Sequence, residues 1–524
     1  MKRRFFRAVL LGLSLCAFPL SLSHAENATA PTTTTFEILT PKAPATPRIN
    51  GPSIFGARPG NPFFYQIPAT GDRPMTFGAK GLPKGLTLDE ATGSIKGVLA
   101  EKGEYKVTLS AKNAKGSAKK EFRIVAGDTI ALTPPMGWNS WNCWAESVNQ
   151  EKVISSAKAM VDKGLRDHGW TYINIDDTWQ GERGGEFHAI QPNPQRFADM
   201  KALCDQVHGM GLKIGIYSTP WTVSYAKRLG GSSENEEGKW DPNANLKAPI
   251  HSHKMPYEVG KYHFATNDAK QWAAWGFDYL KYDWGPVDTT NTLEMRDALV
   301  STKRDIVYSL SNNGPGNIIK IIKDLAPLAS AWRTTGDIND SWKSVQGIGF
   351  SQDKWAPYQT PGHYNDPDML VVGQVGWGRL HPTKLTPDEQ YSHISLWSLL
   401  GAPLLIGCDL AKLDDFTLGL LTNDEVLAVD QDVLCKQGVR VSSDSQLAVY
   451  SKPLEDGSLA VGLFNRTGEK ATVTAQWSDL KIKGKQQVRD LWRQKDLGKF
   501  DDKFEATVAS HGVVFVRIAP AKLW

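Results

Sequence analysis

Residues 172–179 read YINIDDTW, a short β-like apolar run that ends in two adjacent carboxylates, Asp176 and Asp177. Seven other segments have the same β-like character, and helical stretches separate them, which is the pattern of βα units around a parallel sheet. Eight such units predict a (β/α)8 TIM barrel, because no glycine-rich dinucleotide fingerprint follows any strand to favour an open doubly wound sheet. The predicted strands are residues 136–141, 172–175, 213–217, 279–282, 307–310, 331–334, 369–372 and 403–406.

Strand patterns of a different kind flank the predicted barrel. Before it, residues 53–125 alternate short apolar runs with turn sequences, which is typical of a small β-sandwich. After it, strand-like runs occur at residues 447–450, 459–464 and 513–518, and Asp456-Gly457 forms a predicted hairpin turn between the first two. We therefore expect a multidomain chain with a β-sandwich at 51–127, a barrel at 131–434 and an antiparallel β-domain at 435–524.

The first 25 residues have the composition of a secretory signal peptide. A basic start precedes an apolar run over residues 8–22 and a small-residue cleavage site, Ser-His-Ala, at 23–25. The run is shorter than a membrane-spanning helix, so we expect export to the periplasm or outside the cell, without a stable membrane anchor. Lipid attachment at Cys16 is disfavoured by the bulky Leu15. Residues 26–50, rich in Ala, Thr and Pro, predict an extended, solvated linker.

Composition narrows the class of protein. With 41% hydrophobic and 22% charged residues, the chain has enough apolar surface for packed cores and is neither disordered nor collagen-like. The basic residues of the expected signal peptide account for the net charge of +4, so no nucleic-acid partner is indicated. The remaining cysteines, which show no CxxC spacing, are either buried thiols or one or two disulfides: Cys143, Cys204, Cys408 and Cys435.

Carboxylates follow the predicted strands at the barrel face that holds active sites. Asp176 and Asp177 follow strand two, Asp283 strand four and Asp337 strand six, while Asp366 and Asp368 flank strand seven. Each one alone could be a helix N-cap, but their recurrence favours a site. Tryptophans interleave with these acids, which suggests a sugar site in which indole rings pack on a pyranose, although any one of them alone is more often a core residue: Trp141, Trp179, Trp284 and Trp332.

Several blocks resemble glycoside hydrolase family 27, the α-galactosidases and α-N-acetylgalactosaminidases, in the family's order. They are TPPMGWNSW (133–141), YINIDDTW (172–179), GLKIGIY (211–217), YLKYDW (279–284), SAWRTTGDINDSW (330–342) and NDPDML (365–370). The resemblance implies a retaining (β/α)8 hydrolase with a C-terminal antiparallel β-sandwich domain. Residues 81–97 and 103–116 resemble an immunoglobulin-like domain of bacterial surface and secreted proteins, which implies a spacer or adhesion module, with carbohydrate binding as the sharper alternative.

The resemblance also implies roles for single residues. Asp283 matches the nucleophile and Asp337 the general acid/base of a retaining glycosidase, which needs one ionised and one protonated carboxyl group. Lys281 lies two positions before Asp283, on the same face of a strand, where its charge is expected to keep Asp283 ionised. Other matched residues contact the sugar: Asp176 and Asp177 at the 4- and 6-hydroxyls, Trp141 as floor, Tyr217 as wall, Arg333 with Asp368 near the 2-hydroxyl, and Ser311 with Gly314 beside C2.

These observations predict an exported exo-α-galactosidase that removes terminal α-linked galactose from oligosaccharides or glycoconjugates without a metal or organic cofactor. Small side chains beside C2 keep an α-N-acetylgalactosaminidase open, and a β-L-arabinopyranosidase is a further alternative. Trp284 departs from animal members, which have Gly there. A metal-dependent hydrolase could use Asp176, Asp177, His363, Asp366 and Asp368, and a non-catalytic sugar-binding protein could keep the pocket. The N-terminal module is expected to be dispensable for hydrolysis, and the oligomeric state stays open.

Overall fold

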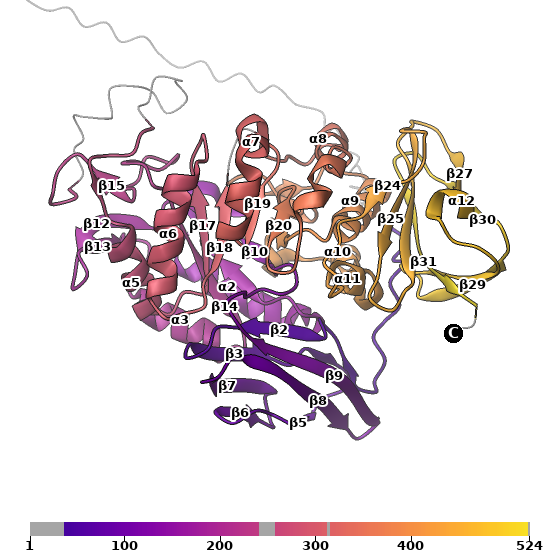
Figure 1. Ribbon diagram of the computed structural model, residues 1–524, viewed down its shortest axis with the longest axis horizontal. Helices are drawn as coiled ribbons and strands as arrows, with labels where there is room; N and C mark the ends of the chain where they lie inside the picture. Colours follow the sequence, from indigo (N-terminus) through magenta and orange to yellow (C-terminus); the bar gives the residue numbers. More distant parts are fainter. Residues whose placement is uncertain (1–35, 240–256, 312–314, 522–524) are drawn as a thin grey trace, which may run out of the picture. The chain divides into compact units, whose positions relative to one another are not determined.

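The computed structural model describes residues 36–239, 257–311 and 315–521. Along the chain they form a β-sandwich, an α/β barrel and a C-terminal β-domain, drawn from indigo through magenta and orange to yellow in Figure 1. The expected signal peptide over 1–25 and the start of the linker lie outside the described residues. Within the described part of the chain, no helix has the length and apolar character needed to cross a bilayer.

The barrel consists of eight parallel strands. Their order in the sheet is β20-β19-β18-β17-β14-β11-β10-β23, and one further parallel bridge, between Leu370 and Ile406, links the two ends of the sheet. The predicted (β/α)8 barrel is therefore confirmed. The strands are β10 (Met136–Asn139), β11 (Tyr172–Asn174), β14 (Lys213–Ser218), β17 (Tyr279–Asp283), β18 (Val307–Ser311), β19 (Ala331–Arg333), β20 (Tyr364–Asp366) and β23 (Leu404–Ile406).

The prediction of the seventh strand, at residues 369–372, is wrong. The strand is β20, and it ends at Asp366, ahead of the apolar run that attracted the prediction. That run is buried, but only Leu370 pairs with a strand, because the chain turns at Asp368, whose φ is 82°. Asp366 and Asp368 thus lie at the C-terminal end of β20 rather than on either side of a strand.

Helices between the strands supply the outer layer of the barrel; α6, for example, lies beside β17 in Figure 1, and α5 packs next to α6. The helix α9 (Pro387–Leu400) illustrates how local sequence sets the bounds. Thr386 and Glu389 form a reciprocal capping box, Pro387 occupies the first turn, and Gly401 ends the helix with a φ of 59°. The other described helices of the barrel are α1 (Trp141–Trp144), α2 (Gln150–Asp162), α3 (Met200–Gly209), α5 (Ala265–Trp275), α6 (Thr289–Ser301), α7 (Pro315–Leu325), α8 (Trp342–Gly349), α10 (Asp415–Leu421) and α11 (Asp424–Asp430).

In the described part of the chain, three antiparallel strand pairs lie in the loops that follow barrel strands. After β11 come β12 (Gln180–Gly184) and β13 (Ala189–Pro192), and β15 (Ser232–Ser233) with β16 (Tyr262–His263) follows β14. After β20 the hairpin is formed by β21 (Gln374–Val375) and β22 (His381–Pro382). Because these loops leave the C-terminal ends of the strands, they extend the walls of the face that holds the candidate site.

The N-terminal domain is a β-sandwich with its own apolar core, as predicted. One sheet has the order β2-β9-β8-β5, the other β3-β7-β6, and a short pair β1-β4 stands beside them. Its strands are β1 (Arg48–Ile49), β2 (Ile54–Ala57), β3 (Pro62–Gln66), β4 (Ala69–Thr70), β5 (Thr76–Lys80), β6 (Leu86–Asp89), β7 (Ser94–Val98), β8 (Gly103–Asn113) and β9 (Gly116–Ala126).

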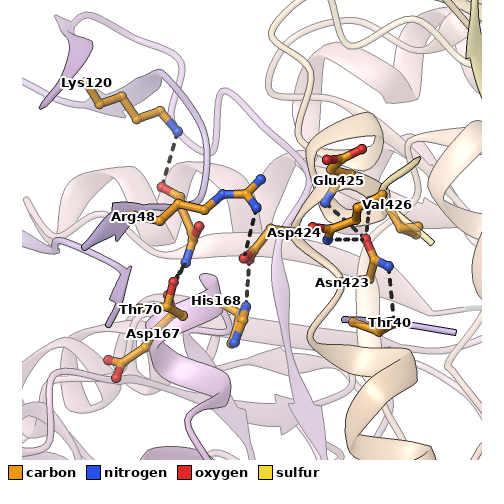
Figure 2. Close-up of polar contacts among 12 residues, drawn as sticks. Thr40, Arg48, Thr70, Lys120, Asp167, His168, Asn423, Asp424, Glu425 and Val426 are labelled. Carbon is orange, nitrogen blue, oxygen red and sulfur yellow. Dashed lines mark hydrogen bonds and ion pairs between the residues drawn. The ribbon is translucent and has the colours of Figure 1, made fainter. Parts of the chain in front are cut away.

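Polar contacts fix this sandwich to the barrel, as Figure 2 shows. Asn50 is buried, and its Nδ2 donates to the carbonyl of Asp167, just before β11, at 2.9 Å. Arg48 lies 3.8 Å from Asp424 of α11, which also lies 2.6 Å from Nδ1 of His168. The expectation of a structurally independent module is therefore revised, because the domain shares buried polar contacts with the barrel, while its dispensability for hydrolysis stays a prediction.

The same domain also covers the N-terminal ends of barrel strands, away from the carboxylates. Asp305, two residues before β18, accepts from the backbone N–H of Arg58 at 3.0 Å and from Nδ2 of Asn61 at 2.7 Å. At the start of β14, Nζ of Lys213 lies 4.7 Å from the ring centroid of Phe55. A module docked in this way supports the barrel from the end opposite the candidate site.

Part of the predicted solvated linker packs on the barrel instead. The hydroxyl of Thr40 donates to the carbonyl of Gly419, and Nδ2 of Asn423 donates to the same hydroxyl (Figure 2). The backbone N–H of Leu39 donates to the hydroxyl of Tyr391 in α9. The linker composition was misleading because small side chains and Pro allow a chain to lie close against a packed surface as well as in solvent.

The C-terminal domain is antiparallel, as predicted, and the hairpin at Asp456-Gly457 joins the expected strands, with Gly457 at a φ of 81°. Its larger sheet has the order β24-β25-β26-β31-β28-β29, and β27 pairs with β30. The strands are β24 (Val439–Arg440), β25 (Leu447–Pro453), β26 (Leu459–Asn465), β27 (Ala471–Gln476), β28 (Gln486–Asp490), β29 (Lys495–Phe500), β30 (Lys503–Val508) and β31 (Val513–Pro520).

All four described cysteines are free, buried thiols, which resolves the alternative left open by their spacing.

Candidate active site

A cavity of about 180 Å³ lies at the C-terminal ends of the barrel strands. Every described residue expected to act in catalysis or sugar binding lines it: Trp141, Asp176, Asp177, Tyr217, Lys281, Asp283, Ser311, Arg333, Asp337 and Asp368. These side chains come from segments more than 200 residues apart, and the closure of the barrel brings them together. The structure thus supports their shared location, while their individual roles remain predictions.

Asp283 is the last residue of β17 and is buried at the cavity wall. The hydroxyl of Tyr217 donates to its Oδ2 at 3.1 Å, while Oδ1 has no hydrogen-bond partner among the described residues. Burial raises the pKa of Asp283 to about 6, although the nearby charge of Lys281 lowers it. The carboxylate therefore ionises close to neutral pH and keeps one oxygen uncommitted.

Lys281 faces the same cavity as Asp283, as the alternation of a strand requires. Its Nζ donates to Oδ2 of Asp176 at 2.8 Å, so its direct ion pair is with Asp176 rather than with Asp283. Burial opposes the charge of Lys281, but Asp176 and Asp283 together raise its pKa above the usual value. The expectation that Lys281 favours the ionised form of Asp283 has the right sign, but burial of Asp283 outweighs it.

Asp176 and Asp177 both reach the cavity because the chain has left the pleat of β11, which ends at Asn174. Thr178 then adopts a φ of 83°, a conformation that is rare for a β-branched residue. Its N–H donates to Oδ1 of Asp177, which also accepts from the hydroxyl of Ser224. Burial raises the pKa of Asp177, against these hydrogen bonds. The carboxylate of Asp177, which faces the cavity, thus stabilises the strained turn at Thr178.

Arg333, at the end of β19, links two further carboxylates. Its Nη2 lies 2.7 Å from Oδ2 of Asp368 and 3.1 Å from Oδ1 of Asp337. Arg333 and Asp368 are buried, whereas the side chain of Asp337 is 69% exposed. Burial raises the pKa of Asp368, and the charge of Arg333 opposes that shift. Asp337 therefore stands at the open side of the cavity.

Of the four tryptophans proposed for the sugar site, only Trp141 lines the cavity. Trp179, Trp284 and Trp332 are wholly buried in the barrel core. Their indole N–H groups donate inside the protein, for example from Trp284 to Oδ2 of Asp288, the N-cap of α6. For these three the alternative of a core residue is confirmed, because a strand end places alternate residues toward the cavity and toward the surrounding helices.

His363 does not join the carboxylates proposed with it as metal ligands. It precedes β20, and its Nδ1 lies 2.8 Å from the carbonyl of Ala329, whereas Asp366 ends the strand and Asp368 follows it. Across residues 36–239, 257–311 and 315–521, no group of three or more His, Cys, Asp or Glu has a metal-binding arrangement.

Beside the sugar's expected C2, Ser311 lines the cavity, while Asn312, Asn313 and Gly314 lie outside the described residues.

Five lining residues were not predicted: Asn142, Tyr225, Ile338, Met369 and Trp377. Asn142, Ile338 and Met369 directly follow predicted site residues, so their sequence position could have indicated them. Tyr225 and Trp377 lie in loops after β14 and β20, where no motif or strand period marks a residue as facing the cavity. Their position depends on the path of the enlarged loops.

Comparisons with known proteins agree with this geometry. Residues 133–235 and 251–432 match the family model described as alpha galactosidase A, residues 444–518 match the alpha galactosidase C-terminal beta sandwich domain, and residues 46–127 match an Ig domain. α-Galactosidase 2 of Arabidopsis thaliana is 37% identical over 398 residues, which cover 75% of this chain and 90% of the relative.

Two solved structures are similar to this chain in both fold and sequence. A Bacteroides fragilis protein assigned as an α-galactosidase is 34% identical, with a TM-score of 0.80 over 93% of this chain and 99% of its own. A family 27 β-L-arabinopyranosidase from Geobacillus stearothermophilus is 26% identical, with a TM-score of 0.63 over 75% of this chain and 98% of its own. The chain therefore belongs to the α-galactosidase family, glycoside hydrolase family 27.

Proposed function

We propose that this glycoside hydrolase is a retaining exo-α-galactosidase. The observation that carries the proposal is the buried Asp283, one oxygen of which has no hydrogen-bond partner in the described part of the chain, in the same cavity as the exposed Asp337. Two carboxyl groups in such different surroundings suit the two tasks of a retaining mechanism, a nucleophile and a proton donor.

In the first step the carboxylate of Asp283 attacks the anomeric carbon, and the bond from that carbon to the leaving oxygen breaks. Asp337 gives its proton to the leaving oxygen, so the aglycone departs as a neutral alcohol. In the second step water attacks the glycosyl-enzyme, Asp337 accepts the water's proton, and Asp283 is released as a carboxylate. Arg333 holds Asp337 and Asp368 in place through the contacts described above.

Galactose is the proposed sugar because the closed end of the cavity carries hydrogen-bonding groups for its axial hydroxyl. Asp176, paired with Lys281, and Asp177 are both buried there, and buried polar groups left unpaired by the wrong sugar discriminate strongly. Ser311 leaves the side beside C2 lined by a small residue, which is the observation that favours α-N-acetylgalactosaminidase as second candidate. β-L-Arabinopyranosidase activity is a third, since a relative of similar fold has it.

Hydrolysis of 4-nitrophenyl glycosides tests the proposal. We expect kcat/KM to be higher for the α-galactoside than for the α-N-acetylgalactosaminide and the β-L-arabinopyranoside. A reversed order would identify a different sugar as the substrate and leave the proposed mechanism unchanged. Binding of galactose without turnover of any of the three would instead favour a non-catalytic sugar-binding protein.

Export is part of the same proposal, supported by the composition of residues 1–25. The natural substrates would then be α-galactosides of oligosaccharides or glycoconjugates in the periplasm or outside the cell. N-terminal sequencing of the mature protein from its host tests this. A first residue at Glu26 is expected, whereas an intact Met1 in the cytoplasmic fraction would overturn it.

A further inference from the structure

Residues 368–371 follow β20 and run past the cavity outside any strand, apart from one bridge at Leu370. Asp368 and Met369 line the cavity. Each backbone N–H of the segment has an acceptor: Oδ1 of Asp366 for Asp368, Oδ1 of Asp368 for Met369, the carbonyl of Leu405 for Leu370, and Nε2 of His393 for Val371. The conformation of this segment therefore depends on side chains as well as on a neighbouring strand.

Two buried aromatic side chains of α9, one helical turn apart, bind the segment. Nε1 of Trp397 donates to the carbonyl of Asp368 at 2.7 Å, and Nε2 of His393 accepts from the N–H of Val371 at 3.2 Å. The two rings pack edge to face, with centroids 4.2 Å apart. Because positions four residues apart lie on one face of a helix, α9 binds both ends of the segment at once.

His393 contributes position more than stability. A neutral imidazole carries one N–H, so the acceptor role of Nε2 places the hydrogen on Nδ1. Nδ1 is buried and has no hydrogen-bond partner in the part of the chain that the structure describes. Burial lowers the pKa of His393 to about 3, so the ring stays neutral near neutral pH. An unpaired Nδ1–H costs stability, as an unpaired N–H of Val371 would, so the net gain in stability is small.

Asp368 connects this segment to the proposed proton donor. Its Oδ2 accepts from the backbone N–H of Ile338, the residue after Asp337, at 2.8 Å. The same oxygen lies 2.7 Å from Nη2 of Arg333, which lies 3.1 Å from Oδ1 of Asp337. Because the side chain of Asp337 is largely exposed, packing alone does not fix it. A shift of Asp368 therefore reaches Asp337 both through the backbone and through the guanidinium group.

We propose that His393 and Trp397 are positioning residues for proton transfer by Asp337: they hold residues 368–371, and through Asp368 they place Asp337 at the leaving oxygen. The inference rests on the proposed function and deepens it. A proton donor must come within about 2.6 to 3.2 Å of its acceptor, and a misplacement of about 1 Å can cost about a hundredfold in rate. Loss of either α9 contact should therefore weaken acid catalysis.

The test compares two α-galactosides whose leaving groups differ in their need for a proton. Methoxide must be protonated as it leaves methyl α-galactoside, whereas 4-nitrophenolate leaves 4-nitrophenyl α-galactoside as a stable anion. In Trp397→Phe and His393→Leu, kcat/KM for the methyl glycoside should fall about tenfold more than kcat/KM for the nitrophenyl glycoside. A disturbance of sugar binding at Asp368 would instead lower both values alike.

Two further variants serve as controls. Trp492→Phe removes an indole bond of the same kind to the same helix, from Nε1 to Oγ of Ser395 at 2.8 Å, and should leave the ratio of the two substrates unchanged. His393→Gln keeps an acceptor for the N–H of Val371 and should recover most of the loss in His393→Leu.

The outcomes separate this inference from the proposed function. If the wild-type enzyme hydrolyses neither substrate, the proposed function fails. If it hydrolyses them, an equal loss on both substrates in the α9 variants, with native circular dichroism spectra, overturns the inference, because α9 would then serve stability or sugar binding alone. Unchanged kinetics overturn it as well. Should one of the two variants fail to fold, the other decides, since each removes a separate bond to the segment.

Discussion

Replacing Asp283 by Asn should stabilise the folded protein at neutral pH while it abolishes turnover. Burial raises the pKa of Asp283 from its ordinary value of 3.8 to about 6, so the folded state resists ionisation. A shift of about 2 units corresponds to about 3 kcal/mol, since one unit is worth about 1.4 kcal/mol. The side chain is 7% exposed, so solvent screens this cost little.

The raised pKa of Asp283 determines how the stability difference between the wild type and Asp283→Asn changes with pH. Well below pH 3.8 the carboxyl is protonated in both folded and unfolded chains, and its burial has no ionic cost. As the pH rises from 4 to above 6, the unfolded chain ionises first, so the wild type loses stability that Asp283→Asn keeps. The advantage of the variant should therefore grow by about 2 kcal/mol between pH 4 and pH 7.

Denaturant unfolding of both proteins, followed by tryptophan fluorescence at pH 4 and pH 7, measures this difference. Comparing two pH values cancels any constant effect of the amide on packing. A difference that stays constant, or that shrinks toward neutral pH, would refute the claim that Asp283 is held as a destabilised buried carboxylate.

Three further predictions concern the site and its support. Tyr217→Phe removes the hydrogen bond that favours ionised Asp283, so the acidic limb of the kcat/KM profile should move to higher pH; movement to lower pH would contradict the assigned hydrogen bond. Asp305→Ala removes the acceptor of Arg58 and Asn61 between sandwich and barrel, and should lower stability by about 1 to 3 kcal/mol with unchanged kcat/KM, which thermal melts and kinetics check together. Prolonged dialysis against EDTA should leave hydrolysis unchanged, and a loss restored by a divalent cation would revive the metal-dependent alternative.

The barrel and its carboxylates could be predicted because each is a local feature repeated along the chain. An apolar run followed by an acid specifies both the strand and the end at which the acid lies, as at Asp176 and Asp283. The seventh strand was misplaced because the apolar residues after Asp368 are buried in the core, but only Leu370 pairs with a strand. A buried apolar segment has the same sequence pattern whether or not it pairs along its length.

Features that depend on contacts between distant segments could not be predicted in the same way. The docking of the N-terminal sandwich relies on single contacts such as Asn50 with Asp167, and neither residue differs in sequence from an ordinary turn residue. Tyr225 and Trp377 face the cavity because Asp177 and Asn142 bind their turns, which no periodicity records.

The most direct test of the central claim, that Asp283 is the nucleophile of a retaining mechanism, is azide rescue of Asp283→Gly. The variant lacks the attacking carboxylate, so it should not hydrolyse 4-nitrophenyl α-galactoside, and the cavity left beside the anomeric carbon should admit azide. The account predicts that added azide restores release of 4-nitrophenol and that NMR identifies the product as β-galactosyl azide. Undiminished hydrolysis by the variant, or formation of the α-azide, would contradict it.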